Sequence, residues 1–168
     1  MVIIFETKRL RVRRLKILDF EPFHEMQSNL NVMQYVRAST MTFQENKDEL
    51  PKLINLYDKP DNDFWIYAIE RKLDAVFVGT IAFVKDENKE DEIGYRFLER
   101  YWGNGYGTEI VNGMVNYCKQ KGFVKLIACV VNNNIVSTKI VKKAGFKFVE
   151  DFVSDDLKVP EQKFELIL

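Results

Sequence analysis

Apolar residues recur along the chain with two different periods. Short apolar runs, either alternating with polar residues or continuous, are typical of β-strands and occupy residues 9–15, 64–70, 75–84, 92–98, 125–131, 146–153 and 162–168. Apolar residues at helical spacing mark residues 19–26, 43–57, 110–118 and 134–144. This succession predicts a mixed sheet with helices on its faces, as in α/β or α+β domains.

Polar residues beside these segments predict where two of the helices begin. Thr42 and Glu45 are spaced as a capping box, which predicts a helix start near Phe43. Asp19 is expected to be the N-cap of the first helix. Pro51 falls inside the second helix and is expected to kink or divide it, because proline lacks the N–H that a helix interior requires.

Residues 92–121 combine a strand, a glycine-rich turn and a helix. The turn has the sequence Tyr101-Trp102-Gly103-Asn104-Gly105-Tyr106-Gly107. Such a turn leaves backbone N–H groups without partners where the helix begins, and the helix dipole favours an anion there. Glycine also lets the backbone adopt positive φ angles and approach a ligand closely. The segment therefore predicts a binding site for a phosphate group.

Two common nucleotide motifs do not fit this turn. A P-loop requires Lys followed by Ser or Thr after its last glycine, whereas Gly107 is followed by Thr108 alone. A dinucleotide fingerprint has the pattern G-x-G-x-x-G and an acidic residue roughly 20 positions later. The turn is instead G-x-G-x-G, and residues 110–149 contain no Asp or Glu. An ATP- or NAD-dependent enzyme is therefore disfavoured.

The window from Trp102 to Gly107 resembles the acyl-CoA signature of the GNAT family of N-acetyltransferases, Gln/Arg-x-x-Gly-x-Gly/Ala. Trp102 replaces Gln or Arg, as in the branch that resembles ribosomal-protein N-terminal acetyltransferases. Two other segments resemble that branch, in the same order and at similar spacing. They are Glu6-Thr7-Lys8-Arg9-Leu10-Arg11-Val12-Arg13, and Asn134-x-x-Ser137 followed by Lys143-x-Gly145-Phe146. The resemblance covers nearly the whole chain.

The resemblance implies one N-acetyltransferase domain over residues 1–168, with a mixed, mostly antiparallel sheet of about six to seven strands flanked by about four helices. It implies acetyl-CoA as the co-substrate and no metal. The main chain of residues 95–98 would hold the pantetheine arm, and the turn would hold the pyrophosphate. Asn134 would contact the cofactor, although an N-cap role explains it equally well. The implied cofactor-binding residues are Phe97, Leu98, Trp102, Gly103, Asn104, Gly105, Tyr106, Gly107, Thr108 and Asn134.

Two side chains are candidates for catalysis. Glu92 begins the strand that would present the thioester, so it is the preferred general base, with Asp91 and Glu150 as alternatives. Ser137 is the candidate acid for the leaving thiolate by resemblance, because residues 132–146 lack the tyrosine that other branches place there. The carboxylates can also be explained as solvated hairpin or loop residues, and Ser137 by packing or capping.

The implied activity is the transfer of acetyl from acetyl-CoA to a primary amine by direct nucleophilic attack. The acceptor would be a protein N-terminus, a polyamine or another small-molecule amine. Residues 34–42 are expected to border the acceptor site, but none of them identifies the acceptor. The alternative is a catalytically weak CoA-binding sensor or interaction domain, which the missing tyrosine favours. A homodimer is compatible with the resemblance, and the sequence does not decide the oligomeric state.

The composition is that of an ordinary soluble protein, with 46% hydrophobic and 30% charged residues. No apolar run approaches the roughly 20 residues of a membrane span, and no signal-peptide pattern is present. We therefore expect a cytoplasmic protein without a membrane partner. Cys118 and Cys129 are expected to be reduced thiols, and the single histidine, His24, disfavours a zinc site.

The net charge of zero conceals an uneven distribution. Residues 110–149 contain seven lysines and no acidic residue, so the remainder carries a net charge of −7. A basic segment suits the phosphates of coenzyme A, and an acidic remainder suits a cationic amine. A chance solvated face would explain the same distribution. A nucleic-acid partner is disfavoured, because the overall charge is neutral and no basic run is dense.

Overall fold

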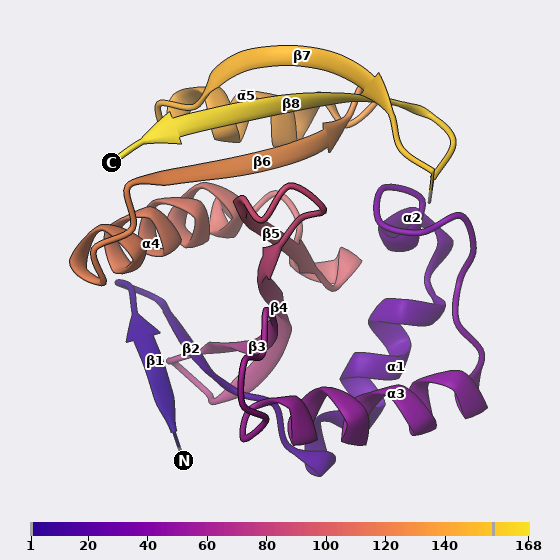
Figure 1. The fold of residues 1–168 in the computed structure, drawn as a ribbon. Coiled ribbons are helices and arrows are strands. Elements are labelled where there is room, and N and C mark those ends of the chain that lie inside the picture. Colours follow the sequence, from indigo (N-terminus) through magenta and orange to yellow (C-terminus); the bar gives the residue numbers. More distant parts are fainter. Residues whose placement is uncertain (1, 156) are drawn as a thin grey trace.

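In residues 2–155 and 157–168, which the computed structural model describes, eight strands form one sheet in the order β1-β2-β3-β4-β5-β6-β8-β7 (Figure 1). Only β5 and β6 are parallel neighbours, and every other neighbouring pair of these strands is antiparallel. The strands are β1 (Ile3–Glu6), β2 (Leu10–Arg14), β3 (Phe64–Arg71), β4 (Val76–Lys85), β5 (Asp91–Phe97), β6 (Lys125–Val131), β7 (Lys147–Val153) and β8 (Pro160–Ile167).

Five α-helices accompany the sheet in the described part of the chain. They are α1 (Phe20–Ser28), α2 (Leu30–Met33), α3 (Phe43–Leu56), α4 (Tyr106–Gln120) and α5 (Ile135–Lys143), with short 3-10 helices η1 (Ile17–Asp19) and η2 (Glu99–Tyr101). The expected mixed, mostly antiparallel α+β architecture is confirmed, with one strand and one helix more than predicted. The additional strand is β1, because a turn closed by the Thr7 N–H on the Leu10 carbonyl (2.8 Å) separates it from β2.

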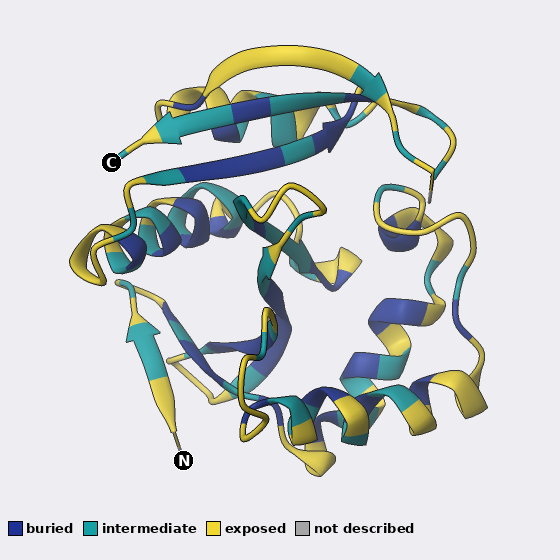
Figure 2. Ribbon diagram, in the orientation of Figure 1, coloured by how far each residue is buried: buried dark blue, intermediate teal, exposed yellow. Residues whose placement is uncertain are grey.

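The helices cover opposite faces of the sheet. Successive side chains of a strand point to opposite faces. On β5, the Arg96 side chain reaches Met33 of α2, whereas the Tyr95 side chain reaches Ser137 of α5. Helices α1–α3 therefore lie on one face, and α4 and α5 lie on the other (Figure 1). Figure 2 shows buried residues on β4 and β6 and on the sheet-facing sides of α1 and α4.

Both predicted helix starts are found, although the expected side-chain cap is present at α3 and not at α1. Thr42 and Glu45 form the expected capping box of α3. Helix α1 follows Asp19, but the Asp19 carboxylate does not cap it, because both carboxylate oxygens accept hydrogen bonds from the buried Arg13 guanidinium (2.8 and 2.9 Å). Helix α3 continues across Pro51, so the proline does not divide it.

Strands β5 and β6 separate almost as soon as they meet. Among the described residues, Glu92 and Ile127 are the only pair in register between the two strands. Strand β6 remains paired with β8 over its whole length, from Lys125 to Val131. The β5 edge beyond Glu92 therefore faces an opening in the sheet instead of a neighbouring strand.

Two glycines beside this opening differ in the space around them. A β-carbon at Gly79 of β4 would lie 2.2 Å from the Arg96 carbonyl oxygen and 2.9 Å from the Phe97 Cα of β5. A β-carbon at Gly94 of β5 would meet only the Ala82 Cβ, at 3.8 Å. Strand β4 can therefore approach the end of β5 this closely only because residue 79 has no side chain.

We expect Gly79→Ala to lower the free energy of unfolding by about 1–3 kcal/mol, as other overpacking substitutions do. The added methyl group meets backbone atoms, which cannot rotate away. Urea denaturation measures the loss, with Gly94→Ala as the matched control in the neighbouring strand. Equal stabilities of the two variants would contradict this packing.

Candidate active site

Free backbone N–H groups gather where the glycine turn enters α4. In the described part of the chain, no N–H of residues 103–108 donates a hydrogen bond to another protein group. The first helical turn also lacks a side-chain N-cap, because its N-cap residue is Gly105. The Trp102 N–H, by contrast, donates to the Glu99 carbonyl (3.0 Å). The N–H groups of residues 103–108, at the positive end of the helix dipole, are therefore available to an anion.

Gly105 and Gly107 are required for different reasons. Gly105 has a φ of +76°, a left-handed conformation that side chains with a β-carbon rarely adopt. A β-carbon at Gly107 would lie 2.8 Å from Ile140 of α5 and 3.4 Å from the Tyr95 ring. The turn therefore packs directly against β5 and α5, on the Tyr95 face of the sheet.

The N-terminal segment anchors the glycine turn through Arg9. Its guanidinium donates to the Asn104 carbonyl (3.0 Å) and forms an ion pair with Glu109 in the first turn of α4 (2.7 Å). The Thr7 hydroxyl donates to the same carboxylate (2.6 Å). Burial raises the pKa of Glu109, but hydrogen bonds from Thr7 and Arg9 outweigh it, so the pKa lies below its ordinary value. The N-terminal segment with Thr7 and Arg9 and the glycine turn with the start of α4, about a hundred residues apart in sequence, therefore form one structural unit.

The β5 edge presents main-chain groups to the opening. The Leu98 N–H donates to the Val78 carbonyl of β4 (3.0 Å). Since N–H groups alternate in direction along a strand, those of Tyr95 and Phe97 point toward the opening. The Trp102 indole donates to the Phe97 carbonyl (3.0 Å) and ties the turn to the end of the strand. Trp102 therefore contributes an indole contact that the motif comparison did not predict.

Glu92 lies at the point where β5 leaves β6. The pKa of its carboxyl group is raised to about 7, mainly by burial and also by the nearby charge of Asp86. A hydrogen bond from the Cys129 thiol acts in the opposite direction. A carboxyl group with a pKa near neutrality is suited to act as a general base.

The two alternative bases are less well placed. The Asp91 carboxylate forms an ion pair with Lys85 (2.5 Å). Glu150 is exposed on β7, the edge strand beyond β8. Asp91 is paired with a lysine and Glu150 is exposed, whereas Glu92 has a raised pKa, so Glu92 is the preferred candidate.

Ser137 and Tyr95 form a hydroxyl pair on the other face of β5. The Tyr95 hydroxyl donates to the Ser137 Oγ (3.3 Å), and burial raises the pKa of Tyr95. Asn134 is the N-cap of α5 and accepts a hydrogen bond from the Ser137 N–H (3.1 Å). The family resemblance implies only a main-chain role for Tyr95, and the sequence does not predict this hydroxyl contact, because a distant helix supplies its partner.

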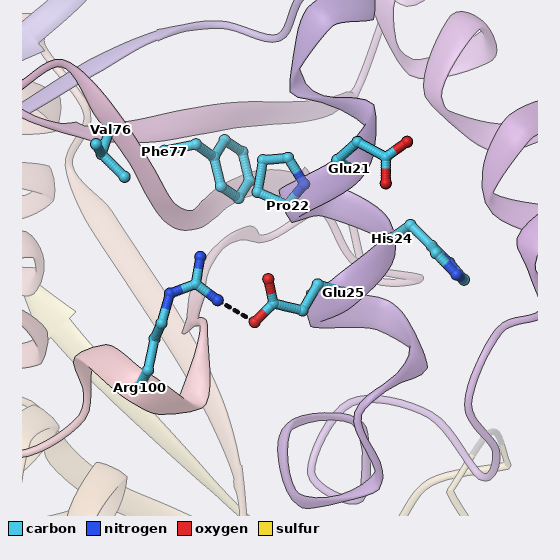
Figure 3. A pocket seen from close by; sticks show the side chains of 7 residues that line it. All are labelled: Glu21, Pro22, His24, Glu25, Val76, Phe77 and Arg100. Carbon is cyan, nitrogen blue, oxygen red and sulfur yellow. Dashed lines mark hydrogen bonds and ion pairs between the residues drawn. The ribbon is translucent and has the colours of Figure 1, made fainter.

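A pocket of about 430 Å³ lies outside this opening, between α1, the start of β4 and η2 (Figure 3). An Arg100–Glu25 ion pair crosses it. None of the residues of β5 or β6 lines it. In residues 2–155 and 157–168 no group of three or more His, Cys, Asp or Glu side chains could hold a metal ion. No helix in these ranges is long and apolar enough to cross a membrane.

Comparison with known proteins decides the family. The family model described as an acetyltransferase (GNAT) domain matches residues 9–147. The chain belongs to the GNAT family. The protein is therefore an acetyl-CoA-dependent N-acetyltransferase, as the resemblance in the glycine turn and its flanking motifs implies.

Similar proteins support this assignment. The uncharacterized N-acetyltransferase YnaD of Bacillus subtilis is 30% identical over 143 residues, which cover 84% of this chain and 81% of that protein. The structure of RimL, a ribosomal L7/L12 alpha-N-protein acetyltransferase in complex with coenzyme A, has a TM-score of 0.81 at 16% identity and covers 99% and 98% of the two chains. That of spermidine N-acetyltransferase from Vibrio cholerae, in complex with CoA and spermine, has a TM-score of 0.79 at 16% identity and 95% coverage of both. The two structures share the fold.

Gly105→Val should remove most of the affinity for acetyl-CoA, because the left-handed N-cap would be lost and the N–H groups would turn away. Calorimetric titration measures the dissociation constant. If the N–H groups of the turn bind the pyrophosphate, several charge-assisted hydrogen bonds are lost together, so we expect affinity to fall by about 100-fold or more.

Gly122→Val is the matched control for this experiment. Gly122 follows the other end of α4 and has a φ of +83°, with no atom close to an added β-carbon. The backbone strain should thus be similar in the two variants. A loss of affinity in both, or in neither, would contradict the assignment of the turn.

Proposed function

We propose that this acetyltransferase transfers acetyl from acetyl-CoA to a primary amine by direct attack in the opening between β5 and β6. The observation that carries the proposal is the early separation of these strands beside the free N–H groups of the glycine turn. The acceptor is a protein N-terminus, a polyamine or another small-molecule amine. RimL and the spermidine enzyme, which share the fold, exemplify the first two classes by their names.

The proposed cofactor contacts are mostly main-chain contacts. The N–H groups of residues 103–108 hold the pyrophosphate, and those of Tyr95 and Phe97 hold the pantetheine arm and the thioester carbonyl. Asn134, the N-cap of α5, is proposed to contact the cofactor as well. Residues 110–149, which follow the turn, contain seven lysines and no acidic residue, a charge balance that suits the phosphates.

The proposed acid and base lie on opposite faces of β5. Residues 92 and 95 differ by an odd number of positions, so Glu92 faces α1–α3 and Tyr95 faces α5. Glu92 takes the proton from the amine, directly or through a water molecule, as the N–C bond forms. Ser137, oriented by Tyr95, gives a proton to the sulfur as the C–S bond breaks. The amine thus approaches from one face and the thiol departs on the other.

The Tyr95–Ser137 hydrogen bond also bears on the sensor alternative. That alternative drew support from the missing tyrosine in residues 132–146. A half-buried tyrosine hydroxyl lies beside Ser137, supplied by β5 instead of α5. An acid group is therefore available to the proposed reaction.

Glu92→Gln should lower kcat by about 100-fold or more, the usual contribution of a general base. Glu92 must be ionised to accept a proton, so wild-type activity should rise with pH up to about 7, the raised pKa of this group. The variant should lack that rise and retain only the titration of the acceptor amine. Thiol release, measured against a panel of amines over a range of pH, gives both profiles.

Asp91→Asn is the matched control, because Asp91 is the neighbouring carboxylate and is paired with Lys85. Activity of Asp91→Asn should still rise with pH up to about 7, as in the wild type. A Glu92→Gln variant with wild-type activity at every pH would exclude Glu92 from the mechanism.

Glu92 should also make stability depend on pH. Its pKa is raised from an ordinary value of 4.5 to about 7 in the folded protein. The folded state therefore binds the proton more tightly, and this stabilisation is complete below 4.5 and is lost as pH rises through 7. Glu92→Gln should consequently be more stable than the wild type at pH values above 7, measured by urea denaturation. A less stable variant at high pH would contradict the burial of this charge.

A further inference from the structure

Strand β5 places an acidic residue, a glycine and a basic residue on one face. Glu92, Gly94 and Arg96 alternate with residues that face α4 and α5. At about 3.3 Å per residue, the Cα atoms of Glu92 and Arg96 are about 13 Å apart, with Gly94 midway. All three face the side of α1–α3, which is the side from which the proposed acceptor approaches.

The space above Gly94 is open. A β-carbon there would meet only the Ala82 Cβ of β4, at ordinary van der Waals distance (3.8 Å). With no side chain at Gly94, no β5 side chain stands between the Glu92 carboxyl group and the Arg96 guanidinium on this face. We refer to the space between these two groups as the slot.

Arg96 has no carboxylate partner among the described residues. Its Nε donates to the Thr80 hydroxyl (3.2 Å), and its NH1 contacts the Met33 sulfur (3.5 Å), a weak acceptor. These two contacts leave the NH2 group without a hydrogen-bond partner in the described part of the chain. The NH2 group is therefore available to a molecule that enters the slot and displaces water from it.

The carboxylate whose charge acts on Arg96, Glu49, already binds other groups. Glu49 of α3 accepts hydrogen bonds from Arg37 (2.6 Å) and from the buried Gln27 (2.5 Å). The pKa of Arg96 is lowered to about 10, mainly by burial. The charge of Glu49 opposes this decrease, and the charge of Arg37 adds to it. Arg96 thus remains a cation at neutral pH, in surroundings that hydrate it poorly and do not neutralise it.

Arg96 does not face the cofactor phosphates. The glycine turn packs on the Tyr95 face of β5, as the proximity of Gly107 to the Tyr95 ring shows. Arg96 points to the opposite face, toward α2. Its missing partner is therefore expected on the acceptor instead of on coenzyme A.

We propose that Arg96 determines acceptor specificity by binding a carboxylate or carbonyl oxygen next to the reacting amine, so that amino acids or peptide N-termini are preferred to polyamines. This rests on the proposed function. A guanidinium binds carboxylate or carbonyl oxygens with two directed N–H groups. It repels the second ammonium group of a polyamine, which would lose affinity in the same slot.

The test compares three acceptors, namely the tripeptide Ala-Ala-Ala, free alanine and spermidine, each with acetyl-CoA. The wild type should prefer an alanine acceptor to spermidine. Arg96→Met should raise the KM for that acceptor by about 10- to 100-fold, the usual effect of losing charge-assisted hydrogen bonds. It should leave the KM for acetyl-CoA unchanged and should not reduce transfer to spermidine. A lower KM for the tripeptide indicates that the acceptor is a peptide N-terminus, and a lower KM for alanine indicates that it is a free amino acid.

Arg100→Met is the matched control, because it removes an equal charge from the exposed η2. It should leave all the KM values unchanged. Arg96→Lys, which keeps the charge but loses the planar fork, should restore part of the acceptor affinity. A wild type that prefers spermidine, or an Arg96→Met variant that weakens all three acceptors equally, would overturn the proposal for Arg96 and leave the acetyltransferase assignment intact.

The absence of transfer to any amine would instead contradict the proposed function. Binding of the tripeptide to the CoA-saturated protein, measured by calorimetry, then decides the role of Arg96 independently of turnover. The proposal requires that the wild type bind the tripeptide and that Arg96→Met bind it at least about tenfold more weakly. Absent or equal binding would overturn it.

Discussion

The separation of β5 from β6 after the Glu92–Ile127 pair is the constraint on which the site depends. A buried strand edge without a partner would normally leave main-chain groups unsatisfied, at a cost of about 1–3 kcal/mol for each group. Here the unpaired N–H groups of Tyr95 and Phe97 are proposed to bind a second extended chain, the pantetheine arm. The opening is stable because β6 keeps β8 as its partner and because Gly79 lets β4 approach the end of β5.

Strand alternation divides the chemistry of the opening between two faces. The glycine turn, Tyr95 and Ser137 lie on the face of α4 and α5, where phosphate and thiol are proposed to bind. Glu92 and Arg96 lie on the face of α1–α3, where the acceptor is proposed to enter. The Arg9–Glu109 ion pair joins the N-terminal segment to the first turn of α4, so a segment about a hundred residues away in sequence helps to fix the cofactor side.

Local pattern predicts most of this fold and only part of the site. The strand, turn and helix of residues 92–121 and the capping box at Thr42 follow from short-range sequence, and the structure confirms them. The Asp19 side chain does not cap α1 because its carboxylate binds Arg13 of β2 instead. The Tyr95 hydroxyl and the Arg96 guanidinium were likewise missed, since partners in distant elements define their roles. A single charged residue among the Ile, Gly, Tyr, Phe and Leu residues of 93–98 was the one available signal.

Amide hydrogen exchange with and without coenzyme A tests the central proposal most directly. If the unpaired edge of β5 and the turn hold the cofactor, coenzyme A should slow exchange at Tyr95, at Phe97 and in residues 103–108. These N–H groups have no strand or helix partner in the described part of the chain, so they should exchange rapidly in the free protein. Protection confined to other segments, with these amides unchanged, would contradict a cofactor site in the opening between β5 and β6.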